Sequence, residues 1–294
     1  MVQHPKLLLR HVVKVCIALL MVGVFSKAVW AAGAQRVIAL APHSVELIYA
    51  LEAGDRLVAT TDYADYPEAA RSVPRIGGYH GIQIEKALAM NPDLVIAWDG
   101  GNKSQDIDRL ESLGLRVYRS RIVSIDAVAD ELRTLGTLLD LTEKAEALAQ
   151  GYEAELAAIR AANANKPRVR FFYQLWLDPL KTLTSESWVN EIPRSCGGEN
   201  IFDRHDSSAY PQVSIEGVLI GKPDVIIVPS HHGTAKAATD HWQRWPEIPA
   251  VRNGHIHGFD GDLLHRASLR LVQGLRDVCA VFDQVRGERE HTNR

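Results

Sequence analysis

The apolar positions between residues 141 and 166 repeat at the spacing of one helical face. This stretch is rich in Ala, Leu, Glu and Lys, which favour helices, and it contains no proline before Pro167. We therefore predict one long helix over residues 141–166, which at about 1.5 Å per residue would be roughly 35 Å long. Its apolar face consists of Leu141, Ala145, Leu148, Ala149, Tyr152, Leu156 and Ile159.

The same short pattern occurs on both sides of this helix. Residues 84–96 and residues 215–227 both read I-E-x-x-L-x-x-x-P-D followed by three aliphatic residues. The pattern predicts a short helix, a Pro-Asp turn and a buried parallel strand. Because it occurs as a pair at identical spacing, it favours two similar lobes over a repeat array. The alternative is that it is simply a common sequence in α/β proteins.

Strands alternate with helices in each predicted lobe, which is typical of a parallel sheet with helices on both faces. In the N-terminal lobe, residues 33–140, we predict strands at 35–40, 56–61, 94–98 and 116–118. In the C-terminal lobe, residues 167–286, we predict strands at 168–175, 225–228 and 255–260, then a helix from about Ser268 and a disordered polar tail over 287–294. The expected fold is α/β, with two Rossmann-like lobes joined by the long rigid helix and a ligand cleft between them.

Residues 1–32 have the features of a secretory signal peptide. Lys6, Arg10 and Lys14 give a positive start, and an apolar stretch over 15–25 leads to small residues around Ala31. This apolar stretch is short for a helix that spans a bilayer. We therefore favour an exported, cleaved chain over one with an N-terminal membrane anchor.

Composition and charge narrow the class of partner. With 46% hydrophobic and 23% charged residues, the chain has the composition of a globular protein, and its length after the signal allows one large domain or two ordinary ones. A net charge of -3 gives no reason to expect nucleic acid or an anionic membrane surface as partner.

Two cysteines, Cys196 and Cys279, remain after the signal segment. In an oxidising compartment an isolated pair of this kind favours a disulfide. Two buried thiols and a metal site are the alternatives, although a metal site would need a tighter cluster of ligands.

Aromatic residues follow several of the predicted strands of the first lobe. Tyr63 and Trp98 stand at strand ends, and Tyr79 lies in a Gly-rich turn. In parallel sheets, ligands bind beyond the carboxyl ends of the strands. Each aromatic residue alone would also fit packing at the edge of a core, but together they predict a wall for a large, flat ligand.

The chain lacks the sequence signatures of the common enzyme classes that we searched for. It has no G-x-S-x-G, no H-E-x-x-H, no P-loop and no G-x-G-x-x-G after a strand. We predict a protein that is not an enzyme, with no catalytic residue. His231, His232, His255 and His257, with Asp260 or Asp262, are ligand types that suit zinc. Their spacing favours solvated loops, so we predict no metal, and a zinc-binding protein remains an alternative.

Six segments together resemble the cobalamin (vitamin B12)-binding members of the periplasmic substrate-binding proteins of ABC importers, the class with a rigid helical backbone between its lobes. The P-D-L-V-I segment is common in the class, whereas Y-x-D-Y-P, A-W-x-G-G-N and C-G-G-E-N-I-F are more specific to the cobalamin binders. The segments are Arg36–Pro42, Tyr63–Pro67, Pro92–Trp98 with Gly100-Gly101-Asn102, Cys196–Phe202, Pro211–Ser214 and Arg266-Ala267-Ser268.

The resemblance implies a role for particular residues. Aromatic rings from both lobes and one carboxylate would contact the corrin, Cys196 and Cys279 would form a disulfide, and a glutamate on each lobe would dock onto arginines of a dimeric permease. The matching positions are Tyr63, Tyr79, Trp98, Tyr210 and Asp262 for the ligand, and Glu85 and Glu216 for the permease.

The resemblance also implies a monomeric periplasmic protein that carries cobalamin to a membrane permease and ATPase complex without any cofactor. A haem-binding or ferric-siderophore-binding protein of the same class is the alternative. The chain departs from the family at Tyr79 and Tyr210, where tryptophan is usual, and at Leu263, where an aromatic residue is usual. These departures bear on the affinity more than on the class of ligand.

Overall fold

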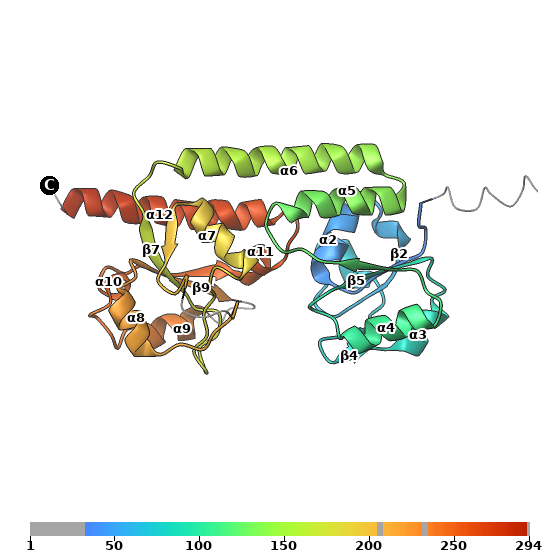
Figure 1. The fold of residues 1–294 in the computed structure, drawn as a ribbon, viewed down its shortest axis with the longest axis horizontal. Coiled ribbons are helices and arrows are strands. Elements are labelled where there is room, and N and C mark those ends of the chain that lie inside the picture. The colour runs from blue at the N-terminus through green and yellow to red at the C-terminus, as the bar shows by residue number, and fades with distance from the viewer. Residues whose placement is uncertain (1–32, 205–207, 231–234, 293–294) are drawn as a thin grey trace, which may run out of the picture.

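The computed structural model describes residues 33–204, 208–230 and 235–292, which form two α/β lobes beneath one long helix (Figure 1). The predicted signal peptide, residues 1–32, lies outside the described residues. Each lobe is built on a four-stranded parallel sheet, so the predicted fold class is confirmed.

The sheet of the first lobe has the strand order β2-β1-β5-β6. Residues 94–97 of its third strand are all buried, because helices cover both faces of a parallel sheet. The strands are β1 (Val37–Ala39), β2 (Leu57–Thr60), β5 (Leu94–Trp98) and β6 (Val117–Ser120), with a small hairpin of β3 (Gly77–Gly78) and β4 (Gly81–Ile82). The α-helices are α2 (Pro42–Ala50), α3 (Ile84–Ala89), α4 (Ser104–Ser112) and α5 (Ala127–Leu139).

The sheet of the second lobe has the strand order β10-β9-β7-β8. Its strands are β7 (Val169–Tyr173), β8 (Gly198–Asn200), β9 (Val225–Ser230) and β10 (Ile256–Asp260). Its α-helices are α7 (Glu191–Ser195), α8 (Ile215–Gly221), α9 (Ala235–Trp242), α10 (Pro249–Arg252), α11 (Gly261–His265) and α12 (Leu271–Thr292).

The repeated sequence pattern has the same structural role in both lobes. It forms α3 and β5 in the first lobe, and α8 and β9 in the second. In each copy the aspartate after the proline binds the start of the neighbouring strand: Asp93 accepts the backbone N–H of Arg36 at 3.0 Å, and Asp224 accepts that of Arg170 at 2.8 Å. The recurrence is therefore structural, since each Pro-Asp turn sets the register of a central strand.

The helix α6 (Thr142–Asn163) joins the lobes and lies across both of them (Figure 1). It is three residues shorter at its end than the predicted 141–166. Pro167 explains the difference, because a proline disfavours helical geometry at the residue before it and cannot donate a backbone hydrogen bond. The face buried by the helix includes Ala145, Ala149, Tyr152 and Leu156, as the apolar spacing predicts.

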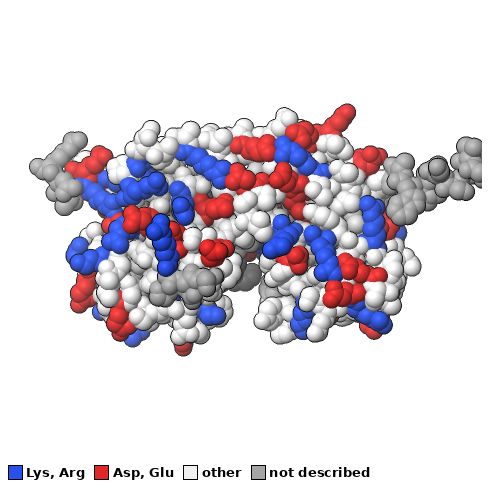
Figure 2. All heavy atoms as spheres, in the orientation of Figure 1, with Lys and Arg blue, Asp and Glu red and all other residues white. Residues whose placement is uncertain are grey.

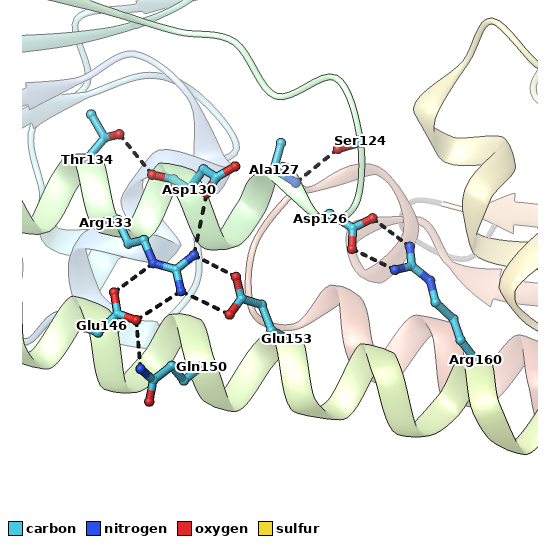
Figure 3. A network of polar contacts seen from close by, with 10 residues as sticks. All are labelled: Ser124, Asp126, Ala127, Asp130, Arg133, Thr134, Glu146, Gln150, Glu153 and Arg160. Carbon is cyan, nitrogen blue, oxygen red and sulfur yellow. Dashed lines mark hydrogen bonds and ion pairs between the residues drawn. The ribbon is translucent and has the colours of Figure 1, made fainter.

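A network of ion pairs holds α6 alongside α5 (Figure 3). Arg133 on α5 bonds to Glu146 at 2.8 Å and to Glu153 at 2.6 Å, both on α6. Farther along, Arg160 forms two bonds of 2.7 Å to Asp126, the residue before α5. Because the charged groups of these pairs remain partly open to water, each pair adds little stability. Their effect is to fix the register of the two helices.

One continuous hydrophobic core lies beneath α6 and belongs to both lobes. It contains Leu132 and Leu135 from α5, Leu156 from α6, Phe171 from β7 and Phe282 from α12. A dense shared core of this kind resists relative motion of the parts that it joins. We therefore expect only modest closure of the lobes.

The predicted disordered tail is wrong for residues 287–292, which continue α12 as a helix. Side chains of this turn bind the second lobe: Glu288 lies 3.1 Å from Nε2 of His255, and Arg289 pairs with Asp224 and donates to the carbonyl of Arg168 at 3.1 Å. These contacts order a polar segment that has no apolar face. Although α6 and α12 have 22 residues each, no helix in the described part of the chain is apolar enough to cross a membrane.

Candidate ligand-binding cleft

A notch separates the two lobes and opens on the edge of the molecule opposite α6 (Figure 2). Large aromatic side chains beyond the ends of the strands remain exposed, although such residues are ordinarily well buried. The exposed fractions are 68% for Tyr63, 87% for Tyr79, 37% for Trp98 and 43% for Tyr210. This exposure leaves all four sequence-predicted rings available to a ligand.

The backbone and the neighbouring residues hold Trp98 in place. The backbone N–H of Trp98 donates to Oδ1 of Asn102 at 2.7 Å, and Nδ2 of Asn102 donates to the carbonyl of Leu40 at 2.9 Å. A Cβ atom at Gly101 would lie 2.0 Å from the indole, so only glycine leaves room for the ring. The G-G-N sequence therefore positions Trp98 before any ligand arrives.

His43, on α2, packs edge-on against the Trp98 ring, with 5.2 Å between ring centroids. Its side chain is buried, and its Nε2 has no hydrogen-bond partner among the described residues. Burial, aided by the positive charge of Arg266, lowers the pKa of His43 from 6.5 to about 4. The ring beneath Trp98 is therefore neutral at ordinary pH.

This shift predicts a loss of stability in mild acid. Between pH 6.5 and 4 the unfolded chain binds a proton at His43 that the folded chain does not, so the free energy of unfolding falls as pH falls. The expected contribution is about 2 kcal/mol between pH 7 and pH 5. Urea denaturation at both pH values should show this difference in the native protein and lose it in His43→Leu.

His80→Leu provides the comparison variant, because it makes the same replacement at an exposed histidine. Burial also raises the pKa of Glu46, and this shift increases the free energy of unfolding as pH falls. The comparison between native protein and His43→Leu therefore isolates the contribution of His43. Equal pH dependence in native protein and His43→Leu would contradict the prediction.

Tyr63 and Tyr79 come from two segments that lie against each other. Tyr63 has φ of +63°, a left-handed conformation that is uncommon for a non-glycine residue. The N–H of Asp62 donates to the carbonyl of Gly77 at 2.8 Å, and a Cβ atom at Gly78 would lie 2.3 Å from the Asp62 carboxylate. The loop after β2 and the β3–β4 hairpin thus hold their two tyrosines on adjacent segments of the first lobe.

The second lobe contributes a ring that the sequence analysis missed. Trp176 is 63% exposed and follows the end of β7 by three residues, as Tyr63 follows the end of β2. Comparison of the two strand ends could have identified it. Nearby, the buried Tyr173 bonds to Nε2 of His265 at 2.9 Å, and burial raises the pKa of the Tyr173 hydroxyl.

Charged residues join the two lobes directly. Arg266 of the second lobe lies 3.1 Å from Glu46 and 2.9 Å from Asp65, both of the first lobe. The same guanidinium lies 2.8 Å from Asp262, the carboxylate predicted to contact the ligand. Glu46, Asp65 and Arg266 are not among the residues predicted from sequence for the site, and only the structure brings them together.

Glu85 and Glu216 occupy equivalent exposed positions as the second residues of α3 and α8. Both helices lie on the side of the molecule away from α6, one on each lobe (Figure 1). Ser214 caps α8, since its hydroxyl accepts the N–H of Gly217 at 3.2 Å. Backbone and Ser214 hydrogen bonds lower the pKa of Glu216, so its carboxylate is ionised.

Two other features lie away from the notch. A hollow of about 680 Å³ lies between the end of α6 and α7, and none of the predicted ligand-binding residues lines it. His255 and His257 stack with 6.0 Å between ring centroids on β10. Across the described residues no three His, Cys, Asp or Glu side chains are grouped to hold a metal ion. His231 and His232 lie outside the described residues.

Cys196 and Cys279 form a disulfide, as expected. It links the end of α7 to α12 within the second lobe, and both residues are buried.

Comparison with known proteins places this geometry in a family. Residues 37–263 match the family model described as periplasmic binding protein. The chain is 38% identical over 266 residues to the vitamin B12-binding protein of Vibrio vulnificus strain CMCP6, covering 90% of this chain and 96% of that relative. It is 36% identical over 258 residues to that of Salmonella paratyphi A, covering 87% and 93%.

Solved structures give the same result. The periplasmic vitamin B12-binding protein BtuF of Vibrio cholerae has a TM-score of 0.79 at 36% identity, covering 86% of this chain and 98% of that one. The periplasmic heme-binding protein RhuT of Roseiflexus sp. RS-1 has a TM-score of 0.77 at 24% identity, covering 86% and 99%, and so shares the fold. The chain belongs to the periplasmic binding protein family.

Proposed function

We propose that this protein captures vitamin B12 (cobalamin) in the periplasm and delivers it to an ABC importer. The observation that carries the proposal is the set of exposed aromatic rings contributed by both lobes. The similarity to vitamin B12-binding proteins over about nine-tenths of the chain supports the same ligand.

A corrinoid suits this cleft chemically. It is a broad, partly apolar disc fringed with amide groups, so aromatic faces can cover the disc while carboxylates and backbone groups accept or donate at its rim. Tyr63, Tyr79 and Trp98 would form one wall, with Tyr210 on the other, and Asp262 would accept a hydrogen bond from an amide. No bond is made or broken, so the role requires neither a catalytic residue nor a cofactor.

Titration calorimetry of the purified mature protein tests the ligand. Cyanocobalamin should bind tightly and be released unchanged, whereas haem, a ferric siderophore and Zn²⁺ should bind weakly or not at all. Micromolar or tighter binding of haem or zinc, without a response to cyanocobalamin, would overturn the proposal in favour of one of those ligands.

The proposal also includes export of the chain to the periplasm and docking to a membrane permease. Residues 1–32 would direct the chain to the periplasm and be removed, and the mature protein would act as a monomer. Two similar lobes, each with an exposed glutamate on α3 or α8, would suit a two-fold symmetric permease. A carboxylate can form two parallel bonds with an arginine, which fixes orientation as well as adding energy.

The double variant Glu85→Ala with Glu216→Ala should therefore leave cobalamin affinity unchanged but abolish most association with the permease and most uptake. Binding to permease in nanodiscs, measured across a salt series, checks the first effect, and calorimetry checks that the cleft is intact. The native interaction should weaken as salt rises, because the contacts are ionic.

A control variant has the same change in charge at a different place. Glu143→Ala with Glu155→Ala removes two exposed carboxylates from α6, on the opposite side of the molecule. It should dock and support uptake normally. Normal docking by Glu85→Ala with Glu216→Ala would show instead that these glutamates only favour the start of their helices.

A further inference from the structure

The two lobes meet at a compact group of charged and polar side chains, which we name the interlobe cluster. The first lobe contributes two carboxylates, one from α2 and one from the loop after β2. The second lobe contributes a carboxylate, a hydroxyl and two guanidinium groups from a single segment. The members are Glu46, Asp65, Asp262, Arg266, Ser268 and Arg270.

Arg266 is the centre of this cluster. Its Nη1 lies 3.1 Å from Oε1 of Glu46 and 2.9 Å from Oδ1 of Asp65, while its Nη2 lies 2.8 Å from Oδ2 of Asp262. Its side chain is only 10% exposed. A planar guanidinium can bond to three carboxylates in fixed directions, whereas the ammonium of lysine acts as a single point of charge.

Glu46 is the second bridge between the lobes. Its side chain is 3% exposed and accepts bonds from Ser268 at 2.5 Å and from Arg270 at 3.0 Å, besides that from Arg266. Buried charges are tolerated when they are paired, and removing one partner leaves the others uncompensated. The Glu46 carboxylate is thus bound by three side chains that lie more than 200 residues away in sequence.

The cluster includes or touches segments that carry predicted ligand-binding residues in both lobes. On one side it binds Asp65, in the loop that also carries Tyr63, and the guanidinium of Arg270 lies 3.8 Å over the ring of Tyr66 in the same loop. On the other side it binds Asp262, at the start of α11. A change at Arg266 would therefore release groups of both lobes together.

We propose that Arg266, held by Glu46, is a positioning residue that fixes the spacing of the two cleft walls and the direction of the Asp262 carboxylate before ligand binds. Its role is to act through these neighbours. The inference rests on the proposed cleft for its effect on ligand affinity, but its effect on the spacing of the lobes is independent of which ligand binds.

The test uses two variants that keep size or charge. Arg266→Lys keeps the positive charge but loses the planar guanidinium group with its directed hydrogen bonds. Glu46→Gln keeps the shape of the side chain but loses its negative charge. Arg119→Lys is the control, because Arg119 bonds to Glu111 at 2.8 Å and to Asp108 at 2.6 Å within the first lobe, outside the cluster. If Arg266→Lys fails to fold, Glu46→Gln still tests the proposal.

Double electron–electron resonance, measured on the protein without ligand, gives the first readout. Spin labels attached at Ser112→Cys on α4 and Ile220→Cys on α8 report the distance between the lobes, since both positions are exposed and the native cysteines are already paired. Native protein and Arg119→Lys should give one narrow distribution. Arg266→Lys and Glu46→Gln should give a broader one.

Calorimetric titration with cyanocobalamin gives the second readout, in which both cluster variants should bind about tenfold more weakly than native protein and Arg119→Lys. Distance distributions that stay narrow in both cluster variants would overturn the inference, whatever happens to affinity. If native protein binds no cyanocobalamin, the proposed function fails, while the distance measurement still decides whether the cluster fixes the lobes.

Discussion

Replacing both Cys196 and Cys279 with alanine is expected to lower the free energy of unfolding by roughly 4–5 kcal/mol. This is the stabilisation that the chain-entropy model gives for a disulfide that closes a loop of this length. The two residues are 83 positions apart in sequence, so the bond greatly restricts the unfolded chain. Both are buried, and the bond joins α12 to the end of α7. Urea denaturation of the oxidised native protein and of the variant measures the difference.

Reduction of the native protein provides the matching control for this prediction. Native protein in excess dithiothreitol should lose about as much stability as the double alanine variant, and mass spectrometry should show the gain of two hydrogen atoms. A loss below about 1 kcal/mol would contradict the prediction, and would mean that the unfolded chain keeps residual structure around the bond or that the bond strains the folded state.

Replacing Trp98 with alanine is expected to weaken cobalamin binding by about 1–3 kcal/mol, or roughly five- to 150-fold in Kd. The ring is 37% exposed, so its outer face is free for a ligand while its inner face rests on Gly101 and His43. Tyr63→Ala should give a loss of similar size. Calorimetry measures each affinity, and urea denaturation checks that the variants remain folded.

Conservative variants show whether the aromatic face is responsible. Trp98→Phe and Tyr63→Phe keep a ring and should retain most of the affinity that the alanine variants lose. If Trp98→Ala and Tyr63→Ala both bind cobalamin as native protein does, the ligand does not stack on the first lobe, and the aromatic wall is wrongly placed.

Local sequence determined most of the fold. The apolar run at 94–97 specified a strand buried on both faces, and the spacing from Leu141 to Ile159 specified α6. The repeated pattern specified two similar lobes, since Asp93 and Asp224 each bind the adjacent strand. These features depend on periodicity and on turn chemistry within a few residues, which is the information that a sequence displays directly.

Tertiary structure alone decided the arrangement of the cleft. Residues 287–292 have no apolar face and are ordered by partners in distant strands and turns. Trp176 and Tyr63 each follow a strand by three residues, and their equivalence becomes visible only once the two sheets have formed. Glu46 and Arg266 are 220 residues apart, and neither has a local pattern that marks it as a partner of the other. Such pairings depend on how the lobes pack beneath α6, because only the complete fold brings these charges out of water and into contact.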